Sequence, residues 1–207
     1  MSKTNVTPPG IPQSVHRGGI RIEINQQQLD HLKASLWKIR DGATVVLRRA
    51  INDTLTGVKT DADREVRAVY NLKSARVKKD FKLRRATDSN LSGAFVASGE
   101  PVGLFQFGAK QNKKGVSVKV LKSEPRKTVR HAFIRIPATR AYTGRQVFWR
   151  AKEEGKMVGR DPLHRLEGPR IEDALAKPEV QKALEQKASE RLNKYLDHET
   201  SYLLGQA

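Results

Sequence analysis

The sequence predicts an α+β protein in which long N-terminal and C-terminal helices pack with a small antiparallel β-sheet of four or five strands. Helical periodicity at residues 27–80 and 178–204 encloses a segment at residues 81–150 in which apolar and polar residues alternate. The hydrophobic share of 37% is sufficient for one modest core. We therefore expect a flexible or assembly-ordered arm at residues 1–19 and a single domain at residues 20–207.

The arm is predicted from composition, because Pro and Gly are frequent in it and few of its other residues can pack. The segment from Ile20 to Ile24 alternates between apolar and polar residues, which predicts a half-buried strand. Asn25 follows and is a residue type that commonly caps a helix. A strand is thus expected to lead into the first helix.

Apolar residues recur at intervals of three and four between residues 27 and 55, which predicts one long helix with a wide buried stripe. Gly57 is expected to end that helix. Thr60 with Asp61 and Asp63 is expected to begin the next one. The stripe fits an ordinary core helix or a helix that also packs against a neighbouring subunit. The residues expected at a subunit contact are Trp37, Leu47, Ile51, Tyr195 and Tyr202.

A short helix is predicted to begin at Ser74, with its cations directed outward. Near Phe81 the apolar period changes from helical to alternating, so a strand should begin there. Further short strands are expected within residues 91–99, 102–109, 115–121, 128–136 and 146–150.

The last third of the predicted domain begins with residues 151–169, whose Gly and Pro content predicts irregular structure. Residues 171–176 are sufficient for one or two helical turns. Pro178 then begins the final helix, at a position where proline is tolerated.

Positive charge is concentrated in the middle of the chain. The formal net charge is +18, and residues 76–165 hold 22 Lys or Arg against 7 Asp or Glu. Such an excess favours an anionic partner, which can be nucleic acid, an acidic protein or an anionic membrane. The cations expected to contact DNA or an acidic partner are Arg76, Lys78, Lys79, Lys82, Arg84, Arg85, Lys110, Lys113, Lys114, Arg126, Lys127 and Arg130.

These cations have the chemistry for phosphate contact, since each can neutralise one backbone charge. No RNP, KH, zinc-finger or basic-zipper pattern accompanies them, so base-specific reading is not expected. The phenylalanines at 81, 95, 105 and 107 fall in apolar alternation and are interpreted as core residues rather than base-stacking platforms. A basic surface that meets only acidic neighbours or solvent stays an alternative.

Sequence patterns of catalysis and metal binding are missing. The 5 histidines lack metal-ligand spacing, and the sequence has no P-loop, dinucleotide fingerprint or nucleophile elbow. With no cysteine, disulfides and thiolate zinc sites are excluded. No apolar run reaches the roughly 18 residues of a membrane span, and the N-terminus lacks the apolar region of a secretory signal. We expect no enzymatic activity, no cofactor, no metal and no membrane contact.

Seven segments, in a consistent order, carry a family resemblance. They are AINDTLTGVKTDADREVRAVYNLK (50–73), SARVKKDFKLRRAT (74–87), FVASGEPVGLFQF (95–107), GVSVKVLKSEPRKTVRHAFI (115–134), QVFWRAKEEGKM (146–157), LHRLEGPRIEDAL (163–175) and ERLNKYLDHETSYLL (190–204). Together they resemble the minor tail protein Z family of long-tailed bacteriophages, which are tail-completion or neck proteins. The resemblance covers most of residues 27–204 and includes no catalytic signature.

The resemblance implies a non-enzymatic structural protein that completes the head-proximal end of the tail, so that the tail can join the head and pass the genome. It implies a homo-oligomer, for which the neck architecture suggests a six-subunit ring around the channel. It implies other tail and neck proteins as partners, namely the tail terminator, the tape measure and head-completion proteins. The basic surface would then face genomic DNA, contacted without sequence preference, or acidic parts of these partners. The location would be the virion, after assembly in the host cytoplasm.

Two other functions are compatible with the sequence. A free, sequence-non-specific nucleic-acid-binding protein would lose about 0.9 log unit of affinity per log unit of salt for each phosphate it neutralises. A metal-dependent nuclease would need carboxylates such as Glu153, Glu154 and Asp161 to form a metal site. Cleavage assays with magnesium or manganese would reveal the latter.

Overall fold

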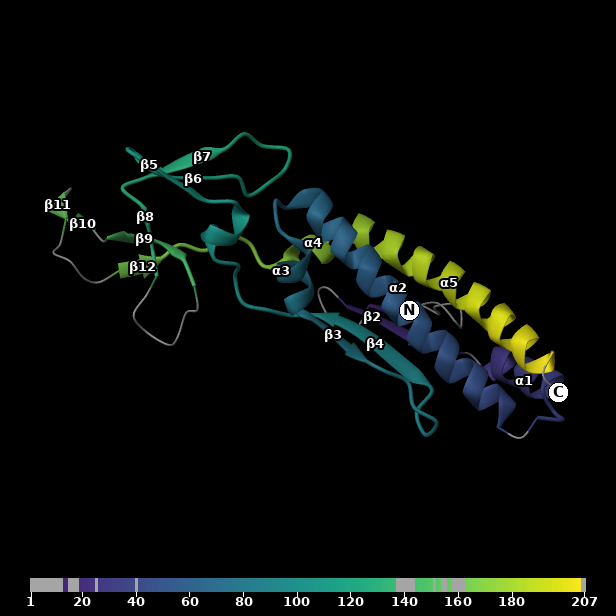
Figure 1. The fold of residues 1–207 in the computed structure, drawn as a ribbon. Coiled ribbons are helices and arrows are strands. Elements are labelled where there is room, and N and C mark those ends of the chain that lie inside the picture. Colours follow the sequence, from purple (N-terminus) through teal and green to yellow (C-terminus); the bar gives the residue numbers. More distant parts are fainter. Residues whose placement is uncertain are drawn as a thin grey trace, which may run out of the picture. The chain divides into compact units, whose positions relative to one another are not determined.

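The computed structural model describes residues 13–14, 19–24, 26–39, 41–136, 144–150, 152–153, 156–157 and 163–205. Helices and antiparallel strands are both present, which confirms a mixed helix and sheet protein (Figure 1). The predicted arm at residues 1–19 lies mostly outside the described residues. The sequence predicts one domain over residues 20–207, whereas the contacts within the chain separate two compact units.

The first unit comprises Met1–Asp63, Phe81–Ser98 and Glu172–Ala207. Its described elements are β1 (Gln13–Ser14), β2 (Gly19–Glu23), α1 (Gln26–Ser35), most of α2 (Gly42–Val69), β3 (Phe81–Arg84), β4 (Ser92–Ala97), most of α4 (Ile171–Leu175) and α5 (Pro178–Leu204).

The second unit comprises Arg64–Asp80 and Gly99–Ile171. Besides the last turns of α2, its described elements are α3 (Ser74–Lys79), the 3-10 helix η1 (Leu104–Phe107), β5 (Lys110–Asn112), β6 (Gly115–Val118), β7 (Lys127–Arg130), β8 (Phe133–Arg135), β9 (Gln146–Arg150), β10 (Lys152–Glu153), β11 (Lys156–Met157) and β12 (Leu163–Arg165).

The sheet of the first unit has the strand order β1-β2-β4-β3 and is antiparallel throughout. Ile20 of β2 lies opposite Phe95 of β4, and Phe95 lies opposite Leu83 of β3, so these side chains share one face. Ile20 and Phe95 are buried, and the Phe95 ring meets the ring of Phe81 edge-on at 5.0 Å between centroids. The expected strand at residues 20–24 and the expected start of a strand at Phe81 are confirmed.

Helix α2 is buried on two sides within the first unit. A Cβ at Gly93 of β4 would lie 2.7 Å from Leu55 and 2.8 Å from Ile51, so the sheet packs directly on this helix. On α5, Leu184, Ala188, Leu192 and Leu196 are buried at intervals of four residues, which is one helical stripe. The predicted final helix from Pro178 is confirmed by α5.

The prediction that one helix ends at Gly57 and another begins near Thr60 is wrong, because α2 continues to Val69. Gly57 is instead a point of close approach. A Cβ there would lie 2.9 Å from Cδ and from Nη1 of Arg191 on α5. Asp61, one turn further along α2, accepts side-chain hydrogen bonds from Arg191 at 2.9 and 3.2 Å. Its acid group therefore joins two helices rather than starting one.

The single helix expected over residues 27–55 is divided at residues 36–41. Backbone hydrogen bonds from Ile39 to Leu36 and from Gly42 to Ile39 form the turn. Asp41 adopts a φ of 56°, which a helix does not allow. Leu36 and Ala43 lie on either side of the break, and both are buried. The apolar spacing of the sequence therefore continues through the break, although the helix does not.

The strands of the second unit do not gather in one sheet of four or five strands. They form a β5-β6-β7 sheet, a β12-β9-β8 sheet and a β10-β11 pair. The strand predicted over residues 128–136 is two strands, because His131 takes a φ of 62° between β7 and β8 and turns the chain. The strand predicted within residues 102–109 is the helix η1, and the region expected to be irregular contains β10, β11 and β12.

The core of the second unit is centred on Phe107, which is fully buried. Tyr70 meets the Phe107 ring edge-on at 6.3 Å, and the Asn71 side-chain amide donates to the Phe107 carbonyl at 3.3 Å. Backbone bonds from Asn71 to Val120 and from Lys122 to Val69 attach the segment after α2 to the strand region. Of the four phenylalanines assigned to the core, 81, 95 and 107 are buried, and 105 is half-buried.

Candidate functional site

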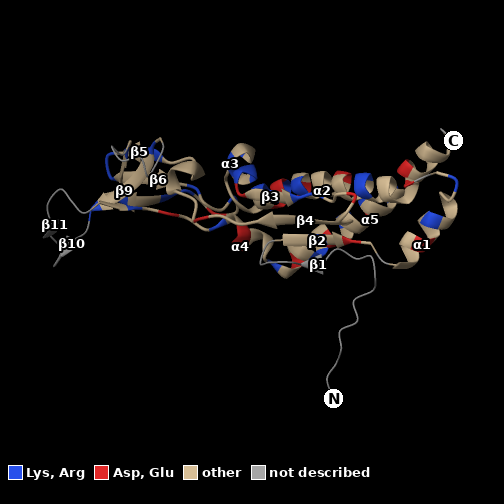
Figure 2. Ribbon diagram, turned by 90° about the horizontal axis from the view of Figure 1, so that it is seen from below, with Lys and Arg blue, Asp and Glu red and all other residues tan. Residues whose placement is uncertain are grey.

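The charge of the protein separates by structural unit. Among described residues, the first unit holds 14 Lys or Arg and 14 Asp or Glu, whereas the second holds 21 Lys or Arg and 6 Asp or Glu. In Figure 2, Lys and Arg (blue) recur around β5 and β6, whereas along α2 they are mixed with Asp and Glu (red). The anionic partner expected from the sequence would therefore meet the second unit.

The β5-β6-β7 sheet has one apolar and one basic face. Val116 and Val118 of β6 are buried, so this strand directs its other side chains away from the core. Ser117 of β6 lies opposite Lys110 of β5 and Thr128 of β7. Arg130 is two residues beyond Thr128 on β7, so it lies on the same face of the sheet. We define the basic face by Lys110, Ser117, Thr128 and Arg130, together with the β5–β6 turn at Lys113 and Lys114. The four basic residues of this face are exposed.

The turn that carries Lys113 and Lys114 is held from both sides. The Asn112 side-chain oxygen accepts a hydrogen bond from the backbone N–H of Lys114 at 3.0 Å. Gly115 has a φ of 147°, and a Cβ at this position would collide with the carbonyl oxygen of Val129. Only glycine fits that conformation and that approach. The two lysines are thus presented by a turn of fixed geometry.

Arg126 and Lys127, both predicted contact residues, have partners within the unit. The Arg126 guanidinium donates to the Ser117 hydroxyl at 3.1 Å, to the Ser117 carbonyl at 2.9 Å and to the Gly108 carbonyl at 2.5 Å. The Lys127 ammonium lies 2.5 Å from a carboxylate oxygen of Glu124. Arg126 therefore stabilises the sheet, and Lys127 has part of its charge compensated.

The predicted cations between residues 76 and 85 belong to two structural units and differ in their partners. Arg76 is not directed away, because its guanidinium lies 2.8 Å from the Asp80 carboxylate and only 19% of its side chain is exposed. Lys78 and Lys79 are exposed at the end of α3 in the second unit, where cations also stabilise the helix dipole. The remaining three, Lys82, Arg84 and Arg85, are exposed in the first unit, whose described residues are balanced in charge.

Two of the five residues expected at a subunit contact are misassigned. Leu47 and Ile51 are completely buried within the first unit, so they are not available to another chain. Trp37 is 76% exposed and Tyr202 is 50% exposed, while Tyr195 is half-buried. Helical spacing predicts which residues share one face of a helix. It does not predict whether that face is covered by the same chain or is available to another subunit.

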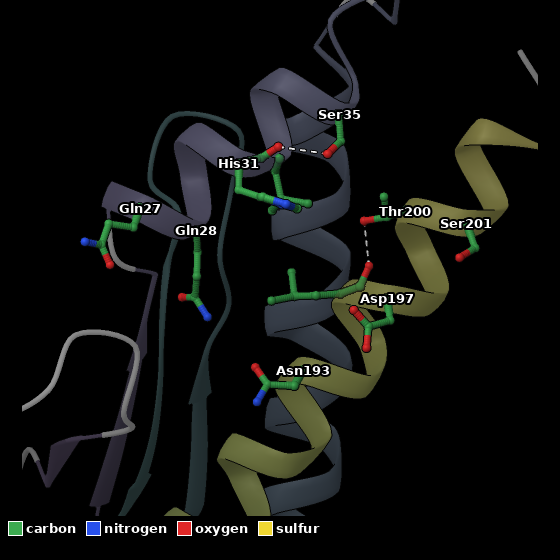
Figure 3. A pocket seen from close by; sticks show the side chains of 10 residues that line it. Gln27, Gln28, His31, Ser35, Asn193, Asp197, Thr200 and Ser201 are labelled. Carbon is green, nitrogen blue, oxygen red and sulfur yellow. Dashed lines mark hydrogen bonds between the residues drawn. The ribbon is translucent and has the colours of Figure 1, made fainter.

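A groove between α1 and α5 of the first unit has a volume of about 750 Å³ and was not foreseen from the sequence (Figure 3). Gln28 and His31 of α1 and Asn193 and Asp197 of α5 point into it. The Thr200 hydroxyl donates to the Leu196 carbonyl at 2.7 Å, so this hydroxyl is engaged with its own helix. Short-range sequence patterns carry no signal for such a groove, because its two walls are far apart in the chain.

Among the described residues, no group of three or more His, Cys, Asp or Glu side chains could hold a metal ion. Burial raises the pKa of the Glu185 carboxyl on α5, and this residue does not line the groove. None of the described helices is both long enough and apolar enough to cross a membrane.

Comparison of the chain with known protein families, curated proteins and solved structures finds no match.

Proposed function

We propose that the protein is a non-enzymatic structural component of a phage tail, which completes the head-proximal end so that the tail can join the head and pass the genome. The ordered segments that resemble the minor tail protein Z family support the phage role. The observation that carries the surface assignment is the separation of charge, with 21 basic against 6 acidic described residues in the second unit only. That unit faces DNA or an acidic tail partner.

In this proposal the first unit is the structural scaffold. Strand β4 of its sheet packs on α2, and Arg191 of α5 pairs with Asp61 of α2. Its described residues include equal numbers of acids and bases, so they add no net repulsion between copies of this unit. Trp37 and Tyr202, both exposed, provide aromatic area for contact with neighbouring subunits of a ring or with other neck proteins. The six-subunit arrangement remains the expectation that the family resemblance supplies.

Deleting the coding sequence from a producing phage tests the proposal. Tails should still form, but they should fail to join heads, and infectious titre should fall by orders of magnitude. The protein should be found by mass spectrometry in purified tails. Particles that lack the protein and are fully infectious would contradict the proposed role.

A free, sequence-non-specific nucleic-acid-binding protein is the second candidate. It is favoured by the four exposed cations of the basic face, which lack ion-pair partners among the described residues. Such a protein would be recovered with cellular nucleic acid and not with purified particles. Fractionation of an infected or expressing cell therefore separates the two candidates.

A further inference from the structure

The basic face gathers four exposed cations on one three-stranded sheet and its turn. Lys110 and Arg130 lie on the two outer strands, and Lys113 and Lys114 lie on the turn, so the cations surround the central strand β6. None of the four forms an ion pair with a described residue. Neighbouring strands are about 4.8 Å apart, so the cations are spread over a width of roughly 10 Å.

The uncharged residues of this face fit a phosphate backbone better than they fit a protein. Between the cations lie Asn112, Ser117 and Thr128, and none of the face's residues is a large apolar side chain. Protein–protein interfaces have cores enriched in aromatic residues and depleted in lysine. Protein–DNA interfaces are more polar and much more positive. An acidic protein partner would leave this face without an apolar centre.

The same composition favours a duplex over a single strand. Proteins that bind single strands combine a basic groove with aromatic side chains on which bases stack. Strands β5, β6 and β7 contain no aromatic residue. A flat face of lysine, arginine and hydroxyl groups can contact phosphates but cannot replace the stacking that an unpaired base loses.

We infer that the basic face binds the phosphate backbone of double-stranded DNA through Lys110, Lys113, Lys114 and Arg130, without reading the base sequence. This inference rests on the proposed function, since it names the partner of the basic surface described there. Arg126 is a positioning residue in this surface, because its three hydrogen bonds connect β6 with Gly108 and hold the sheet on which the cations are displayed.

The test uses the full chain and a fluorescent mixed-sequence duplex of about 20 base pairs, with affinity measured by anisotropy between about 50 and 200 mM salt. One variant removes the four cations of the face: Lys110→Gln, Lys113→Gln, Lys114→Gln and Arg130→Gln. The matched control removes four exposed lysines of the first unit and so has the same net charge: Lys33→Gln, Lys177→Gln, Lys182→Gln and Lys194→Gln.

Four phosphate contacts correspond to a slope of about 3.6 in log affinity against log salt, which is roughly a 100-fold loss over that salt range. In the variant of the basic face, the slope of log affinity against log salt should decrease by this amount. In the control, the slope should equal that of the unchanged protein. Replacing Lys113 and Lys114 by Arg should preserve binding, because charge at the turn is retained. Circular dichroism verifies that each variant is folded.

The inference would be overturned if the slope of log affinity against log salt fell equally in the two four-site variants. It would also be overturned if this slope stayed unchanged in the variant of the basic face. Tighter binding of a single strand of equal length would reject the duplex. Polyglutamate that competes as well as DNA would assign the face to an acidic protein.

Failure of the inference is distinguishable from failure of the proposed function. If the protein is present in purified tails but its basic face does not bind DNA, the proposed tail role stands and the inferred DNA partner is rejected. If the basic face binds DNA but the protein is missing from purified tails, the inferred DNA partner stands and the proposed tail role is rejected.

Discussion

Asp61 of α2 and Arg191 of α5 form an ion pair between these two helices. The Asp61 side chain is 4% exposed and the Arg191 side chain 36% exposed, and Nη2 of the arginine donates to both carboxylate oxygens. A carboxylate this deeply buried needs its cation, because it has lost most of its water. Gly57 leaves the space through which the arginine passes.

We predict that Arg191→Met lowers the free energy of unfolding by about 2–3 kcal/mol, the cost of withdrawing a charged hydrogen-bond partner from a buried carboxylate. Arg49→Met is the matched control, because Arg49 pairs with Glu199 across the same two helices at 3.2 Å but is 46% exposed. Its loss should cost less than about 1 kcal/mol. Equal losses in urea denaturation would show that the Asp61 contact has no special weight.

Glu185 gives the protein a pH dependence that can be measured. Burial raises the pKa of this carboxyl above its ordinary value of 4.5, so the folded state holds the proton more tightly than the unfolded state. The ionised form therefore destabilises the fold at pH values above the raised pKa, and this penalty disappears as pH falls below the ordinary value.

Glu185→Gln should accordingly raise stability at pH 7 by less than about 1 kcal/mol and leave stability near pH 3.5 unchanged. Glu190→Gln on the exposed side of the same helix is the control and should change stability little at either pH. Thermal unfolding of the three proteins at the two pH values decides the matter. A gain from Glu185→Gln that is equally large at low pH would contradict the burial argument.

At the scale of elements, β4 approaches α2 closely at Gly93. Gly93 permits it, since a Cβ would meet the Leu55 Cδ1 atom at 2.7 Å and the Ile51 Cγ2 atom at 2.8 Å. Both partners are fully buried, so neither can move into solvent. The backbone of the strand thus lies against the helix without an intervening side chain.

Gly93→Ala is expected to cost about 1–3 kcal/mol through overpacking. Leu55→Val in the same chain removes the atom that the new methyl group would meet, and it should recover part of the loss. A double-mutant cycle by denaturant unfolding measures the coupling. Additive effects of the two substitutions would mean that the strand can shift away from the helix.

Elements with strong local signals could be predicted from the sequence. Pro178 and a regular apolar spacing define α5, and the change of period at Phe81 marks the start of β3. Gly57 was misassigned because the same residue suits a helix end and a helix–helix contact, and only the position of Arg191 decides between them. The division of the strands among several sheets also depends on partners that alternation does not specify.

The candidate site was predictable in part. Composition identifies the lysines and arginines of the middle region, and their exposure follows from their cost of burial. The sequence does not show that Arg76 pairs with Asp80 or that Arg126 donates to the Ser117 carbonyl of the adjacent sheet. Those contacts depend on tertiary geometry, which decides which cations stay available.

For the whole molecule, we predict that inorganic polyphosphate raises the unfolding temperature by a few degrees at low salt, because a ligand that binds only the folded state stabilises it. The rise should vanish at about 1 M salt, where the Debye length is about 3 Å. The variant lacking the four cations of the basic face should show a smaller rise than the matched control. Scanning calorimetry gives both results, and an equal rise in all proteins would contradict the prediction.

The unequal charge of the two units has a kinetic consequence. Because the described residues of one unit are balanced in charge and those of the other are strongly positive, a distant polyanion exerts a torque on the molecule as well as an attraction. The protein would turn its charged part forward before contact, so that few encounters begin in the wrong orientation. Such pre-alignment acts at separations up to about 10 Å at 0.1 M salt, and it would favour rapid, correctly directed docking.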